Sequence, residues 1–256
     1  MRRAALPVLF GCLVLLGTVS PARAWSDATR LRMVRDALKV TPPALDAVLD
    51  HYRRELDRGM LALSKHEEEE VHYQNVEGGG LAAAAAARKS REALVLLSEK
   101  GRLKRFVFEM GTLAHLVSDV SFPLNASDAD PREPLYREAY RAYIESVLDK
   151  IPFVLDTTPA PALDRGDLEG YLQERARRAG RGYAAIGAAF KDDGTPRTPD
   201  ALDERSIPFG ISSLAYSQAV NDIARLWAAV WQKSGGDMTP PAVPPGEEAK
   251  RAEPGS

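Results

Sequence analysis

The sequence predicts an all-α protein, built as a single-domain multi-helix bundle. Apolar residues recur every three or four positions along several segments, and no alternating apolar run or hairpin signal of useful length occurs. The composition is 45% hydrophobic and 27% charged, which excludes a disordered or collagen-like chain. The formal charge is −2 and no basic run stands out, so an electrostatic nucleic-acid binder is disfavoured.

The first 24 residues are typical of a secretory signal peptide. Arg2 and Arg3 precede a mostly apolar run over 4–19, and Ala22-Arg23-Ala24 fits a cleavage site. The run is short and contains Pro7, which favours a signal peptide over a membrane span. We therefore expect an exported protein, periplasmic or extracellular, whose mature chain starts at Trp25. Cys12, the single cysteine, lies in the removed segment, so no disulfide is expected.

The mature chain is expected to form one helical domain over 25–237. Ser26 or Asp27 can cap a first helix that runs to about Lys39, and Thr41-Pro42-Pro43 fits the start of a second helix reaching Leu63. The proline-rich tail over 238–256 is expected to be disordered. Further helices are expected at 81–97, 103–122, 134–151, 168–190 and 213–231, with a long loop over 191–208.

The helix over 103–122 carries the most chemical information. No charged residue occurs between Met110 and Ser118, and apolar residues surround most of the helix, which predicts burial. His115 and Asp119 are four residues apart and therefore share one face. A buried carboxylate needs a cation or several hydrogen-bond donors. The pattern fits either a hydrogen-bonded His115–Asp119 pair inside a bundle or a zinc site, for which both are ordinary ligands.

The segment from His115 to Leu124, HLVSDVSFPL, resembles the signature helix of the bacterial zinc-dependent phospholipases C. The same superfamily holds the fungal single-strand-specific nucleases. Other segments are similar too, and the resemblance covers most of 25–124 and about 213–237. These segments are Trp25-Ser26, 55–60, His72-Tyr73, Leu226-Trp227 and 235–237.

The resemblance implies a helical fold with zinc ions in a cleft, which bind phosphodiester oxygens and activate a water. It implies Trp25, His72, His115 and Asp119 as metal ligands, with Asp119 and His115 at the catalytic centre. Trp25 would bind through its carbonyl and its free amine, and the amine exists only after cleavage. The alternative interpretation is that Trp25 is only an apolar anchor at the start of the chain. Other ligand positions carry no ligand: they fall near Ser64 and at Asn125, Arg137 and Arg141, and no histidine lies between Trp25 and His51. One zinc ion is therefore expected rather than three.

Two groups of charged residues near these positions remain open in interpretation. Arg137 and Arg141 either replace a lost ion and hold a phosphate, or form a plain surface stripe paired with Glu138 and Glu145. His66 and the acidic run over 67–70 either supply further metal ligands or form a solvated helix face.

Two functions follow. The first is an exported zinc hydrolase of phosphodiesters, with phospholipid favoured over nucleic acid as substrate. The second is a metal-poor, inactive relative that serves as a binding or structural module, in which His115 and Asp119 only satisfy each other.

Overall fold

The computed structural model describes residues 24–63, 69–76 and 79–238. This part of the chain is helical and contains no strand, with a lone β-bridge between Phe190 and Pro196, so the all-α prediction is confirmed. Residues 1–23 of the predicted signal peptide, nearly all of the tail, Ser64, and His66 with the start of the acidic run lie outside the described residues. The helices are α1 (Asp27–Leu38), α2 (Pro43–His51), α3 (Arg53–Ala62), η2 (Glu69–His72), α4 (Ala82–Ser98), α5 (Leu103–Val120), η3 (Pro123–Asn125), α6 (Glu133–Ser146), η4 (Leu148–Lys150), α7 (Pro161–Asp164), α8 (Leu168–Gly180), α9 (Tyr183–Gly187) and α10 (Ile207–Lys233).

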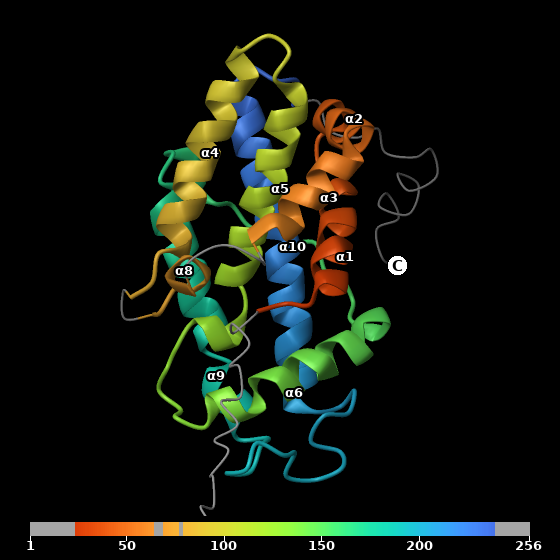
Figure 1. Cartoon of the computed structure of the whole chain (residues 1–256), viewed down its shortest axis with the longest axis vertical. Coiled ribbons are helices and arrows are strands. Elements are labelled where there is room, and N and C mark those ends of the chain that lie inside the picture. The colour runs from red at the N-terminus through yellow and green to blue at the C-terminus, as the bar shows by residue number, and fades with distance from the viewer. Residues whose placement is uncertain (1–23, 64–68, 77–78, 239–256) are drawn as a thin grey trace, which may run out of the picture.

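Helix α5 is the centre of the bundle (Figure 1). It packs against α3 and α4 and also contacts α10 and α8, while α6 crosses one end of the bundle. All residues from Met110 through Val120 are buried, because most of them are apolar and the helix is packed on several sides. The long helix α10 is fixed to α5 by Trp227, whose indole Nε1 donates to the Met110 carbonyl at 2.9 Å.

Local signals set several helix ends. Ser26 caps α1 by accepting from the Thr29 N–H at 3.2 Å, as expected for one of the two candidate caps. Ser206 caps α10 in the same way, and Pro208 follows in its first turn. This cap starts the last helix at Ile207, so the predicted start at Ser213 is wrong.

Other predicted boundaries shift where the chain bends. The expected helix over 43–63 is interrupted at Tyr52, whose backbone (φ −106°, ψ 35°) is not helical. The expected helix over 168–190 is divided into α8 and α9, and Gly182 at the junction lies so close to Ile211 that a Cβ there would come within 2.6 Å of its side chain. The four-residue helix α7 was not predicted.

None of the helices in the described residues is both long and apolar enough to cross a bilayer.

Candidate metal centre

Helix α5 presents two functional side chains on one buried face. His115 and Asp119 are one turn apart, and both are fully buried. The third side chain, His72, comes from the last residue of η2, and 16% of its surface is exposed. Two segments that are far apart in the sequence, η2 and α5, therefore meet at the C-terminal half of α5.

The carboxylate of Asp119 is the meeting point of the cluster. Its Oδ2 lies 2.6 Å from Nδ1 of His72 and 3.2 Å from Nε2 of His115. The three donor atoms that these residues can offer lie within 4.8 Å of one another. The structure thus brings together the three side chains that the sequence singles out.

The hydrogen bonds of His115 define which ring nitrogen carries the proton. Nδ1 lies 2.6 Å from the Met60 carbonyl, which can only accept, and 2.6 Å from Nη1 of Arg30, so we assign the ring proton to Nδ1, toward the carbonyl. The lone pair of Nε2 then accepts from Nη1 of Arg30, 2.5 Å away, beside the Asp119 carboxylate. Burial lowers the pKa of His115, and the nearby Arg30 guanidinium lowers it further, so the ring is held neutral. A neutral imidazole whose other nitrogen donates to a carbonyl is the form in which histidine binds metals.

Arg30 of α1 completes the cluster. Its Nη2 donates to Asp119 Oδ1 at 2.7 Å, its Nε donates to the Trp25 carbonyl at 3.1 Å, and its Nη1 lies 2.5 Å from Nε2 of His115. Burial alone would raise the pKa of Asp119, but Arg30 and the two histidines outweigh burial and hold that pKa far below its usual range. Asp119 is therefore ionised, with a guanidinium as its counter-ion.

The sequence analysis did not identify Arg30, although a signal was present. Arg30, Val34 and Ala37 recur at helical spacing and form the buried stripe of α1 together with Met33. An arginine inside such a stripe requires a buried anion. Asp119, on a helix without a basic residue nearby, required a buried cation.

Trp25 is an anchor beside this cluster. Its side chain is buried, packs edge-on against Phe122 with ring centroids 5.0 Å apart, and donates from Nε1 to the Ser118 carbonyl at 2.8 Å. Its carbonyl accepts from Arg30. The predicted role of Trp25 as a metal ligand stays a prediction.

A second buried arginine, Arg137 of α6, is linked to His72 through Asn125. It donates to the side-chain oxygen of Asn125 at 2.8 Å and to the Leu124 carbonyl at 2.6 Å, and it pairs through Nε with Glu133. Asn125 in turn donates from Nδ2 to the backbone carbonyls of His72 (2.8 Å) and Asp119 (3.2 Å). Because each guanidinium nitrogen of Arg137 already has a protein partner and the side chain is buried, this arginine positions Asn125, and its phosphate-holding role stays a prediction.

The other candidates do not join the centre. Arg141 pairs with Glu138 on the surface, in line with the plainer interpretation. Glu70, at the end of the acidic run, is exposed. His51 is exposed and contacts Tyr52.

Comparison with known proteins supports the fold. No family model and no curated protein matches the sequence. Among solved structures, the alpha-toxin of Clostridium perfringens from avian strain SWCP matches with a TM-score of 0.63 and 12% identity, over 85% of this chain. The alpha toxin from Clostridium absonum matches with a TM-score of 0.63 and 14% identity, over 86% of this chain. The match spans 66% of the length of each toxin. The chain therefore has the all-α, phospholipase C-type fold of the clostridial alpha-toxins, as the sequence resemblance predicts.

Proposed function

We propose that the chain is an exported, zinc-dependent phosphodiester hydrolase with a reduced metal site. One zinc ion would be held by His72, His115 and Asp119. The observation that carries the proposal is the convergence of two imidazoles on one buried carboxylate, with donor atoms within 4.8 Å of one another.

The donor set fits zinc in number, chemistry and size. Two nitrogens and one carboxylate oxygen are the usual protein ligands of a catalytic zinc, which leaves a fourth position open. Three atoms that are at most 4.8 Å apart all lie within about 2.8 Å of a common point, so closing to zinc distances of about 2.0–2.2 Å needs movements under about 1 Å. The Met60 carbonyl already orients the His115 ring, and Nη1 of Arg30, now 2.5 Å from Nε2, would have to move aside for the ion.

A single ion is favoured because two guanidinium groups lie next to His72, His115 and Asp119. Arg30 engages the Trp25 carbonyl and the second oxygen of Asp119. Arg137 donates to the side-chain oxygen of Asn125, whose Nδ2 in turn donates to the His72 carbonyl. Each guanidinium carries a fixed positive charge and occupies the acceptors that a further cation would need.

Zinc, when bound, would supply Lewis acidity toward a phosphoryl oxygen and lower the pKa of a water. The protein side chains orient and neutralise the site. Arg30 keeps Asp119 ionised, the Met60 carbonyl keeps His115 in one tautomer, and Asn125 fixes the backbone of His72. The partly exposed His72 gives the buried centre its contact with solvent.

The substrate class proposed is phospholipid, ahead of nucleic acid. The phospholipase C-type fold supports a phosphodiester substrate, and the sequence lacks the basic run of a nucleic-acid binder. Export is proposed on the signal-like segment over 1–24.

The test uses tag-free protein that begins at Trp25. We expect elemental analysis to find about one zinc per chain, and short-chain phosphatidylcholine to be hydrolysed faster than a single-stranded oligonucleotide. His115→Ala should abolish zinc binding and hydrolysis, whereas the matched control His51→Ala, which removes an exposed histidine outside the centre, should keep both. Absence of zinc and of turnover in the unmodified chain would refute the proposal.

A metal-free binding or structural module is the second candidate. It is favoured by the contact between Arg30 and Asp119, which already balances the buried charge without an ion. Under this alternative, zinc would not change the melting temperature, and Arg30→Gln would destabilise the chain equally with zinc and with EDTA. Under the hydrolase proposal, zinc should raise the melting temperature and partly rescue Arg30→Gln, because the ion takes over as counter-ion of Asp119.

A further inference from the structure

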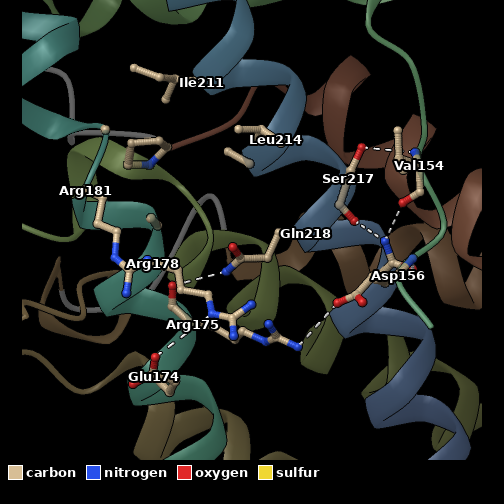
Figure 2. A pocket seen from close by; sticks show the side chains of 15 residues that line it. Val154, Asp156, Glu174, Arg175, Arg178, Arg181, Ile211, Leu214, Ser217 and Gln218 are labelled. Atoms are coloured by element: carbon tan, nitrogen blue, oxygen red, sulfur yellow. Dashed lines mark hydrogen bonds and ion pairs between the residues drawn. The ribbon is translucent and has the colours of Figure 1, made fainter. Parts of the chain in front are cut away.

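A second site lies between α8 and α10, apart from the metal centre. A cavity of about 580 Å³ opens there, closed on a third side by the extended segment around Val154 and Asp156 (Figure 2). A volume of this size suits a small organic ligand. None of Trp25, His72, His115 and Asp119 lines it.

One wall of the cavity is basic. Arg175, Arg178 and Arg181 follow one another at three-residue spacing on α8 and its C-terminal end, and all three line the cavity. Arg175 is held by the Tyr171 hydroxyl at 2.8 Å and by Asp222 at 3.1 Å. Arg178 and Arg181 are exposed. Within the described residues Arg178 has a single ion pair, with Glu174 at 4.0 Å, and the side chain of Arg181 has no partner.

The acids near this wall make only long contacts with it, Glu174 with Arg178 at 4.0 Å and Asp156 with Arg175 at 3.9 Å, and their shorter contacts are with other arginines. Glu174 accepts from Arg177, outside the cavity, at 2.6 Å. Asp156 pairs with Arg225 at 3.3 Å. The guanidinium groups of Arg178 and Arg181 therefore keep hydrogen-bond donors to offer at the mouth of the cavity.

The part of α10 that lines the cavity carries an exposed apolar patch beside its polar residues Ser217, Gln218 and Asn221. Ile211 and Leu214 of α10 line the cavity there, and Val154 borders it (Figure 2). Leu214 is 74% exposed and Val154 is 61% exposed, which leaves apolar surface for a ligand to cover.

The shape of the cavity is fixed before any ligand arrives. Ser217 accepts from the Val154 N–H at 3.1 Å, and Asn221 accepts from the Asp156 N–H at 2.9 Å. Gln218 donates to the Arg175 carbonyl at 3.1 Å and joins α10 to α8. Such cross-links reduce the entropy that a ligand must overcome.

We propose that this cavity binds a phosphate monoester that carries an apolar group. Two neighbouring guanidinium groups match the three terminal oxygens of a phosphate better than the two oxygens of a carboxylate. The apolar group lies along Ile211 and Leu214.

The test measures binding by calorimetry, with the chain in EDTA, using octyl phosphate as the probe. Inorganic phosphate, octanoate and octyl glucoside separate the contributions of the anion and of the chain. We expect octyl phosphate to bind at least about tenfold more tightly than each of the three.

Variants assign the site. Arg178→Gln with Arg181→Gln should weaken octyl phosphate at least about tenfold, and Leu214→Ser should weaken octyl phosphate but not inorganic phosphate. Glu174→Gln should strengthen binding, since it removes a negative charge from the wall. The matched control, Arg165→Gln with Arg205→Gln, removes the same charge from exposed positions outside the cavity and should change little.

Equal weakening by the two double variants, or the absence of octyl phosphate binding, would overturn the assignment. Because the assay needs neither zinc nor turnover, its failure is distinct from failure of the proposed hydrolase function.

Discussion

Helices α3 and α5 approach so closely that their backbones touch at two glycines. A Cβ on Gly111 would lie 2.1 Å from the Leu56 carbonyl oxygen, and a Cβ on Gly59 would lie 2.0 Å from the Phe108 carbonyl oxygen. Both obstacles are backbone atoms, which cannot rotate away. We therefore expect Gly111→Ala to force the two helices apart by about 1 Å.

Opposing contributions set the size of the effect. Overpacking costs about 1–3 kcal/mol, at the upper end here because the clash is with a helix backbone. Alanine in place of glycine in a helix contributes about 1 kcal/mol of stability. The free energy of unfolding should fall by about 2 kcal/mol, measured by urea denaturation with circular dichroism.

The control is Gly210→Ala in α10, where an added Cβ meets no atom within 4 Å. Helix propensity acts alone there, so stability should rise by up to about 1 kcal/mol. Gly111→Ala should also weaken zinc binding about tenfold, because α3 carries the Met60 carbonyl that orients His115. If Gly111→Ala were as stable as the unmodified chain, the tight helix crossing would be refuted.

Two further predictions concern buried charges. Burial raises the pKa of Asp222 to about 6 against the partial opposition of neighbouring arginines, so the fold favours its protonated form. Its contribution to stability is full below about pH 4 and is lost as the pH rises through about 6, roughly 3 kcal/mol in all. In the Asp222→Asn variant, the free energy of unfolding from denaturant titrations should no longer fall between pH 4 and 7. If it fell with pH in parallel in the variant and the unmodified chain, the assignment would be contradicted. Arg137→Met should cost about 3–5 kcal/mol in the same assay at pH 7, since it leaves Glu133 and Asn125 without their partner. The partly exposed Arg141→Met should stay within about 1 kcal/mol, and equal losses in both variants would contradict the buried role of Arg137.

The fold was predictable because the helical signal is local and strong. Alanine-rich α4 and the apolar α5 follow directly from residue type and spacing. The misplaced boundaries have tertiary or capping causes. The run over 168–190 is divided at Arg181 and Gly182, where α10 packs so closely that a Cβ on Gly182 would lie 2.6 Å from Ile211, and the sequence of one helix does not carry that information.

The candidate centre was predictable in part for the same reason. His115 and Asp119 share a face by spacing alone, but His72 was linked to them by resemblance, since it comes from a separate short helix. Arg30 was missed because its partner Asp119 is 89 residues away in the sequence. The two residues could have been paired only by noting that a buried arginine needs a buried anion and that a buried carboxylate needs a buried cation.

The charge balance around Asp119 limits what the centre can hold. Arg30 already neutralises this carboxylate, and Arg137 is neutralised by Glu133. One zinc ion would therefore leave this group of side chains with a net positive charge, which favours an anionic phosphodiester as the remaining ligand. A second ion would meet two fixed guanidinium groups with no further carboxylate of the described cluster to offset it, at a desolvation cost of several kcal/mol. Arg30, together with Arg137 at a ligand position of the resembled family, thus favours a site with one ion and a substrate that brings its own negative charge.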